Sequence, residues 1–273
     1  STGPRQFFQF KIDIIPTDKS GGEVEFIEFR TSEPLASELI GEVFPSQANI
    51  AELSPFTYYL QPSIAGDATG FDGLELTTSS IINSVMALRI GEVDVPLDPD
   101  DVIPLDIDGQ PVLSFPANGF ELNLGGRKLV AEDSGTPIEV DFDARVLRSG
   151  TAFDMRVLNT DQPLAVRQKV DAGDANNLIE GNTVSVSTTA GAESLLKANV
   201  TKVFTPNDDG TNDVASISYD LLEIIGASEV TIEISDLSGR VVKQVYSGRD
   251  AVGHYDRVWM GLDDSGDLVP PGV

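Results

Sequence analysis

The amino-acid sequence predicts an all-β protein, and three observations carry this prediction. Short runs rich in β-branched and aromatic residues recur at intervals of about 8 to 12 residues. Proline and glycine separate these runs, as is typical of turns between strands. Only Ser46–Leu53 and Ala190–Ala198 have the composition of short helices. Together these features favour a large antiparallel β-sandwich with jelly-roll-like packing of two sheets.

The strand pattern begins close to the N-terminus. Phe7–Ile15 reads FFQFKIDII, a β-prone stretch that includes Phe8 and Phe10 and would favour aggregation if it stayed unpaired. Glu23–Thr31 alternates apolar and polar residues with one shift, which predicts a half-buried strand with a bulge. The further predicted strands are Phe56–Leu60, Phe71–Leu76, Ser84–Ile90, Val112–Phe115, Phe120–Leu124, Ile138–Leu147, Phe153–Leu158 and Val184–Ser187.

The first polar, glycine- and asparagine-rich stretch that resembles a linker is Asp171–Asn182. We therefore predict one large β-sandwich over residues 1–190, a linker over 191–198 and a second domain over 199–273. An alternative divides the first region near residues 96–104, where proline and aspartate are abundant.

The charge of the chain excludes some partners. Its 273 residues include 18 Lys and Arg against 44 Asp and Glu, a formal net charge of −26. Such a field repels nucleic acid and anionic membranes and attracts divalent cations. Because the acids are spread along the chain, a solvated acidic surface explains most of them.

The sequence contains no cysteine, which excludes thiol catalysis, thiolate metal sites and disulfide bonds. No apolar run approaches the roughly 20 residues that span a bilayer, so we expect no membrane insertion. The chain starts at Ser1 without a basic, apolar leader, which favours a processed or trimmed N-terminus.

The C-terminal region has a regular strand and turn pattern. Val230, Ile232 and Ile234 alternate with polar residues, which predicts a strand with one buried face. Asp236–Gly239 then has the aspartate and glycine of a tight turn, and Asp263–Gly266 repeats this spacing. The pattern predicts two hairpins.

This pattern resembles the FlgD-like immunoglobulin-like domain, which recurs at the C-terminus of bacterial exported and cell-surface proteins. The opening of the region, with Thr205, Pro206, Asn207, Asp209, Gly210, Asn212 and Asp213, is similar to the start of C-terminal modules in gliding-motility and type IX secretion substrates. The further matching residues are Tyr219, Leu221, Asp236, Leu237, Gly239, Arg240, Gly253, Tyr255, Trp259, Gly261, Asp263, Gly266, Pro271 and Gly272.

The resemblance implies an immunoglobulin-like β-sandwich over residues 199–273 and an extracellular or cell-surface location in a bacterium. The chain departs from the family pattern at two places. Asp208 stands where related modules have glycine, and the sequence stops at Val273, where the family continues into a final strand. We therefore expect that strand to be absent from this sequence or to come from elsewhere. No comparable resemblance covers residues 1–198.

The opening loop of this domain is a candidate calcium site. Calcium takes six to eight oxygen ligands, often from closely spaced side chains on a loop turned sharply at glycine. The alternative is a set of turns in which Asx side chains bind their own backbone, and we leave both open. The candidate ligands are Asn207, Asp208, Asp209, the carbonyl of Thr211, Asn212 and Asp213.

Other chemistry is sparse. His254 is the single histidine, and its place in the FlgD-like turn favours a structural or exposed role over that of a catalytic base. No motif for a hydrolase, metalloprotease or nucleotide-binding site is present, so we predict no enzyme activity. A second acidic run comprises Asp98, Asp100, Asp101, Asp106 and Asp108. A solvated loop is the default interpretation of this run.

Phe56, Tyr58, Tyr59 and Phe71 could form a sugar-stacking platform on one face of the sandwich, although their spacing favours the core for most of them.

Two classes of function follow. The first is a non-catalytic structural or adhesive surface protein. Its copies would self-associate into a fibre or surface layer by exchange of β-strands, or it would bind other surface proteins. The second is a carbohydrate-binding module of a secreted polysaccharide-degrading enzyme, with a glycan as ligand.

Overall fold

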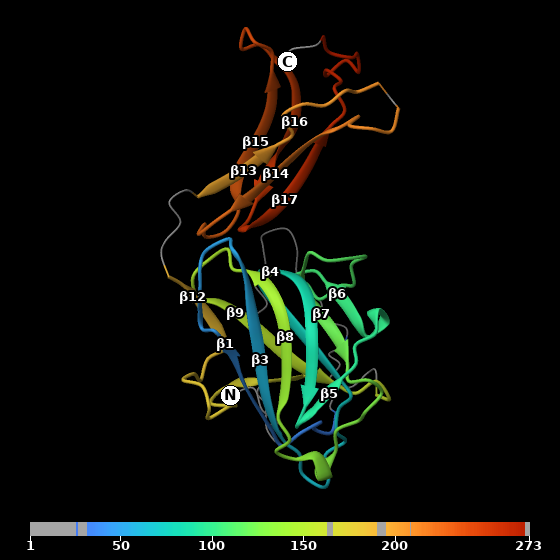
Figure 1. Ribbon diagram of the computed structural model, residues 1–273, viewed down its shortest axis with the longest axis vertical. Helices are drawn as coiled ribbons and strands as arrows, with labels where there is room; N and C mark the ends of the chain where they lie inside the picture. Colours follow the sequence, from blue (N-terminus) through green and yellow to red (C-terminus); the bar gives the residue numbers. More distant parts are fainter. Residues whose placement is uncertain (1–25, 27–31, 163–165, 190–194, 208, 271–273) are drawn as a thin grey trace.

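The computed structural model describes residues 26, 32–162, 166–189, 195–207 and 209–270 of the chain (Figure 1). These residues form strands and two short 3-10 turns, η1 (Pro99–Asp101) and η2 (Ala131–Asp133), which confirms the all-β prediction. In the described part of the chain, no helix is long and apolar enough to cross a membrane.

The N-terminal domain is a sandwich made from one sheet that folds over on itself. The central strand β4 (Gly73–Ile90) takes part in both layers. Its first half pairs with β7 (Ala117–Asn123) and β9 (Thr151–Leu158). Its second half pairs with β8 (Ile138–Arg145) and β5 (Val93–Val95). β9 and β8 pair with the same edge of β4, β9 along its first half and β8 along its second half. The sheet therefore passes from one layer to the other along β4.

The remaining strands extend both layers. On one side, β3 (Leu53–Ser63) pairs with β8, and β1 (Glu38–Phe44) pairs with β3. The other strands of this domain are β2 (Gln47–Ala48), β6 (Val102–Leu105), β10 (Gln168–Lys169), β11 (Asp171–Ala172) and β12 (Ser185–Thr188).

The core of the sandwich comes from strict alternation along these strands. In β8, Ile138, Val140, Phe142 and Ala144 are buried and the residues between them are not. The rings of Phe56, Phe142 and Phe153 meet at centroid distances of 5.5 to 5.8 Å, in the range favoured by aromatic pairs. Period-2 placement thus fills the space between the two layers with aromatic and branched side chains.

The C-terminal domain is a smaller sandwich of two sheets. Strands β13 (Leu196–Val200), β14 (Ala215–Leu221) and β17 (Gly253–Trp259) form the first sheet. The hairpin of β15 (Ser228–Ser235) and β16 (Val241–Asp250) forms the second. The turn between β15 and β16 is the predicted Asp236–Gly239 turn, which confirms the first hairpin. The second predicted hairpin is reduced to one bridge, between Leu262 and Leu268.

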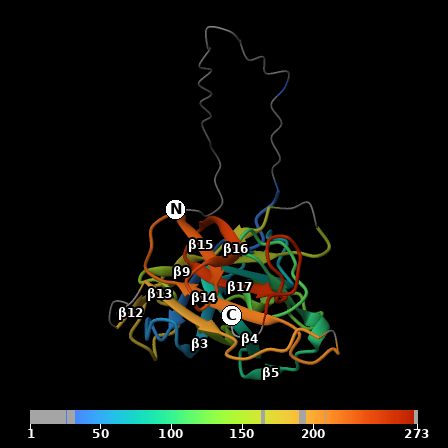
Figure 2. The same cartoon turned by 90° about the horizontal axis from the view of Figure 1, so that it is seen from above.

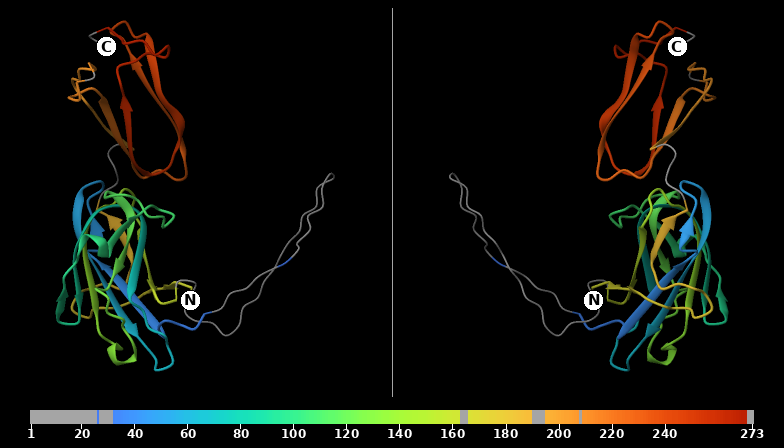
Figure 3. Two further views of the ribbon diagram at one scale, coloured as in Figure 1. Left: turned by 90° about the vertical axis from the view of Figure 1, so that its right-hand side faces the viewer. Right: turned by 90° about the vertical axis from the view of Figure 1, so that its left-hand side faces the viewer.

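The two domains lie end to end along the longest axis of the molecule (Figure 3), and they overlap when the molecule is seen along this axis (Figure 2). Ile81 and Leu147 of the first domain form a buried cluster with Leu222 of the second. The next residue, Glu223, donates its backbone N–H to the Leu147 carbonyl at 3.2 Å and accepts from the Ser149 N–H at 3.1 Å. Glu223 adopts φ 54°, an uncommon conformation for a residue with a side chain, and these two contacts hold it there.

Several sequence predictions were wrong. Residues 46–53 form β2, a turn and the start of β3 in place of a helix. In the second predicted helix, Leu196–Val200 is a strand that pairs with β14, so residues 196–198 belong to the C-terminal sheet and not to a linker. Residues 112–115 form an irregular segment with bends in place of a strand. The segments Phe7–Ile15 and Glu23–Thr31 lie outside the described residues, apart from Phe26.

The alternative split near residues 96–104 falls inside one sheet. Strand β6 begins at Val102 and pairs with β7, which in turn pairs with β4. The proline- and aspartate-rich stretch therefore joins strands of the same sandwich.

Candidate functional site

The most unusual surface of the described molecule is the incomplete side of the C-terminal sandwich. Residues of β13 pair directly with residues of β14: Ala198 lies opposite Tyr219 and Val200 lies opposite Ile217. Directly opposed residues in an antiparallel pair point to the same face of the sheet. Tyr219 and Ile217 are buried, whereas all five residues of β13 are exposed, with Val200 at 51%. Within the part of the chain that the structure describes, the inner face of β13 is therefore exposed.

The second sheet is correspondingly narrow. Among the described residues β15 pairs with β16 alone, which leaves the other edge of β15 open. The inward residues Val230, Ile232 and Ile234 are only partly buried. Since β16 contacts β17, the hairpin covers the β17 side of the first sheet and leaves the β13 side open.

A polar cluster fills the centre of this sandwich. The buried Asp250 carboxylate accepts hydrogen bonds from the Tyr219 and Tyr246 hydroxyls, each at 2.5 Å. The Arg257 guanidinium lies 4.2 Å from the Tyr246 ring centroid and 3.5 Å from Asp250. Burial, followed by the hydrogen bond to Asp250, raises the pKa of Tyr219. The cluster satisfies a buried charge with hydroxyl and guanidinium donors.

The predicted calcium loop forms Asx turns. The Asp213 carboxylate accepts from the Asn207 N–H at 3.0 Å and the Gly210 N–H at 2.7 Å. Asp209 accepts from the Thr211 N–H at 2.8 Å and from the Asn207 side chain at 2.9 Å. Asp208 lies outside the described residues, and the carbonyl of Asn212 accepts from the Thr205 N–H.

The loop thus gathers three of the predicted ligand side chains around Gly210, which has φ 83°. Their oxygens retain lone pairs beyond those used by the backbone, so the donor set suits calcium. Calcium binding here stays a prediction, and so does the alternative of a turn stabilised by its own backbone. Among the described residues, no group of three or more acidic or histidine side chains has metal-binding geometry.

The second acidic run does not form one cluster. Asp98 precedes η1, and its N–H donates to the Asp101 carboxylate at 3.2 Å. Asp106 lies beyond β6 and accepts from the N–H groups of Asp108 and Gln110. These carboxylates stabilise two separate turns.

The core placement that the spacing favoured for most of the four aromatic residues is confirmed. Phe56, Tyr58 and Phe71 are 0 to 2% exposed and belong to the core. Burial raises the pKa of the Tyr58 hydroxyl, which reflects its enclosed position. Tyr59 alone lies on the outer face of its sheet, beside Thr57 and Glu139. A single half-buried tyrosine cannot form a sugar-stacking platform of several aromatic rings.

His254 has carboxylates on both sides. Its Nδ1 lies 2.6 Å from an Asp220 oxygen and its Nε2 lies 3.4 Å from Asp256. It borders a cavity of about 370 Å³ between the two domains, together with Ile81 and Asn118. The arrangement is that of a hydrogen-bonded histidine beside the domain interface.

Two polar networks of the N-terminal domain escaped the sequence analysis. In the first, the buried Glu75 pairs with Arg156 at 2.9 Å and with Arg167, which also pairs with Glu121 at 2.9 Å. Glu75, Arg156 and Arg167 line a cavity of about 600 Å³ together with Gln110. The sequence showed only separate charged residues, which the structure places in β4 (Glu75), in β9 (Arg156) and just before β10 (Arg167).

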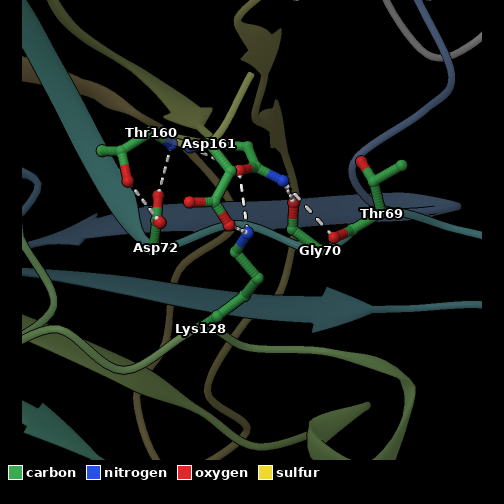
Figure 4. A network of polar contacts seen from close by, with 7 residues as sticks. Thr69, Gly70, Asp72, Lys128, Thr160 and Asp161 are labelled. Atoms are coloured by element: carbon green, nitrogen blue, oxygen red, sulfur yellow. Dashed lines mark hydrogen bonds and ion pairs between the residues drawn. The ribbon is translucent and has the colours of Figure 1, made fainter. Parts of the chain in front are cut away.

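The second network fixes the end of β9 (Figure 4). The buried Asn159 side chain accepts from Lys128 at 2.9 Å and donates to the Gly70 carbonyl at 3.1 Å. Asp72 accepts from the backbone N–H and the hydroxyl of Thr160, at 2.8 and 2.6 Å. Among the side chains shown, the buried Thr69 hydroxyl has no partner, whereas those of Asp72, Lys128, Asn159, Thr160 and Asp161 all have one, which indicates a structural role for the network.

The fold defines the class of the second domain as an immunoglobulin-like sandwich. Residues 207–273 match the family described as the FlgD Ig-like domain, which confirms the resemblance seen in the sequence. No curated protein matches the chain.

Among solved structures, the full-length major pilin SpaD from Corynebacterium diphtheriae is 12% identical, with a TM-score of 0.31, over 86% of this chain and 52% of that one. The pilus backbone RrgB from Streptococcus pneumoniae is 14% identical, with a TM-score of 0.31, over 83% and 47%. Domains D2 and D3 of the same pilin SpaD are 12% identical, with a TM-score of 0.30, over 86% of this chain and 79% of that one. The chain spans about half the length of the first two pilins, and TM-scores this low carry no functional inference.

Proposed function

We propose that this protein is a non-catalytic structural subunit of an extracellular bacterial assembly and that it self-associates through its β-domains. The observation that carries the proposal is the end-to-end joining of two β-sandwiches through the buried Leu222. The apolar, β-prone Phe7–Ile15 segment supports self-association, because such a segment gains free energy when another surface covers it.

The connection between the domains suits a load-bearing subunit. Leu222 is fully buried against the first domain, and Glu223 binds Leu147 and Ser149. An apolar contact with backbone hydrogen bonds restricts the hinge motion that is the default for two linked domains. The acidic surface keeps such a subunit soluble before assembly.

The contact between copies is expected to be heterologous. The surface offered by the C-terminal domain differs from the β-prone Phe7–Ile15 segment at the other end of the sequence. Contacts between unlike surfaces produce open chains unless the rotation closes a ring. A fibre or layer is the assembly that this arrangement favours.

Deletion of residues 1–12 tests the proposal. We expect the truncated protein to remain folded and monomeric, while the intact chain forms larger species in light scattering and electron microscopy. Deletion of residues 1–5, which leaves the alternating segment intact, is the matched control. Polymers that persist unchanged without residues 1–12 would contradict the role of this segment, and an intact chain that stays monomeric at all concentrations would contradict self-association.

A carbohydrate-binding function is the second candidate, and the cavity beside Arg156 and Arg167 favours it. Guanidinium groups and the Gln110 amide line a concave surface that sugar hydroxyls or carboxylates could occupy. A glycan array tests this candidate: specific binding should fall with Arg156→Ala and Gln110→Ala and persist with Arg249→Ala, which lies in the other domain. Tyr58→Ala is unsuitable because Tyr58 is in the core.

A further inference from the structure

We propose that His254 and Asp256 form a binding site for a divalent transition-metal ion such as Zn²⁺ at the joint between the two domains. The ion would lie between Nε2 of His254 and a carboxylate oxygen of Asp256, with water completing its coordination. This inference goes beyond the proposed structural role and does not depend on it.

The sheet of the C-terminal domain brings the two side chains together. His254 and Asp256 are alternate residues of β17, so both point to the same face of the sheet. Asp220 lies directly opposite His254 on β14. This face borders the cavity of about 370 Å³ that Asn118 of the N-terminal domain also lines. An ion held between His254 and Asp256 therefore has room for further ligands.

The hydrogen bond to Asp220 determines which nitrogen of His254 can bind a metal. Nδ1 lies 2.6 Å from an Asp220 oxygen. An ionised carboxylate only accepts hydrogen bonds, so Nδ1 carries a proton, and in the neutral ring Nε2 keeps a free lone pair. A carboxylate bonded to the other ring nitrogen is the usual arrangement of metal-binding histidines, because it fixes the tautomer and the orientation of the ring.

The distance on the other side of the ring indicates what fits there. Nε2 lies 3.4 Å from an Asp256 oxygen. In the neutral ring both atoms are acceptors, so a cation between them is needed to make this approach favourable. A shared proton would draw the two atoms to about 2.7–2.9 Å, the usual length of a charge-assisted N–H···O bond. A tetrahedral Zn²⁺ ion with bonds of about 2.0–2.1 Å holds two ligand atoms about 3.3 Å apart, which matches the structure.

The types of ligand favour a transition metal over calcium or magnesium. Imidazole nitrogen suits Zn²⁺, Cu²⁺ and Ni²⁺, whereas Ca²⁺ and Mg²⁺ take oxygen ligands. The site has two protein ligands, which agrees with the absence of a metal-binding group of three acidic or histidine side chains among the described residues. Water would fill the remaining positions, and the net charge of −26 attracts divalent cations to the protein.

The cavity connects this site to the N-terminal domain. Asn118 belongs to β7, and its Nδ2 donates to the Ser80 carbonyl at 2.8 Å. This bond holds the Asn118 carboxamide in place, and its Oδ1 can accept a hydrogen bond from a metal-bound water. A bound ion would therefore add a polar link between the domains to the apolar contact at Leu222.

NMR tests the site directly, because His254 is the single histidine of the chain. Protein labelled with ¹⁵N and purified without a histidine tag is titrated with Zn²⁺ at neutral pH. We expect the Nε2 resonance of His254 to shift on addition of Zn²⁺, while Nδ1 keeps its proton. Mg²⁺ should leave both resonances unchanged. Isothermal titration calorimetry of the same samples measures the affinity.

Four variants assign the ligands. Asp220→Asn should weaken Zn²⁺ binding about 10- to 100-fold, the usual effect of changing the partner of a metal-binding histidine. Asp256→Asn should weaken it by at least about tenfold, and its exposed side chain makes a loss of folding unlikely to interfere. His254→Gln should abolish binding at this site. Glu233→Gln, at an exposed carboxylate of β15, is the matched control and should keep the affinity of the parent chain.

Other results would overturn the inference. A His254 ring that does not respond to Zn²⁺, or that stays doubly protonated in its presence, would show that a proton bridges to Asp256. Undiminished binding by Asp256→Asn would show that His254 binds the ion without this carboxylate. Equal binding by His254→Gln would place the ion elsewhere on the acidic surface. None of these results affects the proposed self-association, which the deletion of residues 1–12 tests separately.

Discussion

At the scale of single residues, short polar side chains determine the turns of the C-terminal domain. Asp236 accepts hydrogen bonds from the Ser238 hydroxyl at 2.5 Å, the Ser238 N–H at 2.9 Å and the Arg240 N–H at 3.1 Å. These donors, of which the Ser238 hydroxyl is the strongest, lower the pKa of Asp236 to about 2. The turn between β15 and β16 is therefore held by an ionised carboxylate.

Ser238→Ala should raise the pKa of Asp236 toward the usual aspartate value of about 3.9, because it removes the largest stabilising donor. An NMR titration of the side-chain carboxyl measures this change, with Ser247→Ala as control. The folded pKa lies below the unfolded value, so the contribution to stability is present above about pH 4 and is lost as the pH falls toward 2. An unchanged titration in Ser238→Ala would show that the backbone donors alone account for the low pKa.

Tyr219→Phe should lower the free energy of unfolding of the C-terminal domain by about 1.5 to 3 kcal/mol, the usual value for a hydrogen bond to a charged group. The reason is that Asp250 loses one of its two hydroxyl donors inside the sandwich. Chemical denaturation measures the change, and Tyr59→Phe on the outer face of the other domain is the control.

The same tyrosine makes the domain sensitive to alkali. Its folded pKa is raised, so above pH about 10 the unfolded state releases a proton that the folded state retains. The stability present below pH 10 is therefore lost as the pH rises further. The loss should be smaller in Tyr219→Phe, and an identical alkaline profile in both proteins would contradict the assignment.

At the scale of elements, the alternation of apolar residues predicted most strands but missed the longest. Most of the predicted strand Phe71–Leu76 and all of Ser84–Ile90 belong to β4, which starts at Gly73 and continues through Thr77 to Asn83. That interval lacks alternation because β4 changes layers there, with Asn118 donating to the Ser80 carbonyl at 2.8 Å. Local pattern cannot show a strand whose two halves face different neighbours.

For the candidate sites, too, the sequence showed only what is local in the chain. The Asx-rich loop was recognisable because Asn207, Asp209 and Asp213 are close in sequence. The Glu75–Arg156–Arg167 network depends on pairings between distant strands. No spacing in the sequence encodes these contacts, which only the sheet topology brings together.

Gly119→Ala tests the close pairing of β4 and β7. A Cβ at this position would lie 2.2 Å from the Leu76 carbonyl oxygen, so the backbone of one strand must move. Overpacking of this kind costs about 1 to 3 kcal/mol, and we expect a loss at the upper end of this range in thermal or denaturant unfolding. Gly66→Ala, where no atom lies within 4 Å, should leave stability nearly unchanged. Equal effects of the two substitutions would contradict the close approach.

At the scale of the whole molecule, the two domains behave as one unit if the contact at Leu222 holds. Leu222 is 0% exposed although it directly follows β14 of the second domain. It packs against Ile81, where β4 changes layers, and against Leu147, where β8 passes toward β9. The contact therefore touches the two places at which the N-terminal sheet folds over.

Leu222→Ala should uncouple the domains. Truncation of a fully buried leucine costs about 2 to 5 kcal/mol, and here the loss falls on the interface because the side chain inserts into the other domain. We expect calorimetry to show two separated unfolding transitions, and small-angle scattering to show a broader distribution of domain separations. Leu237→Ala, at a turn where leucine is 92% exposed, should change neither result. Leu222→Ala could instead retain the unfolding transitions and the scattering profile of the parent chain. That result would show that the hydrogen bonds of Glu223 alone fix the joint between the domains. Glu223→Ala should then produce the uncoupled behaviour.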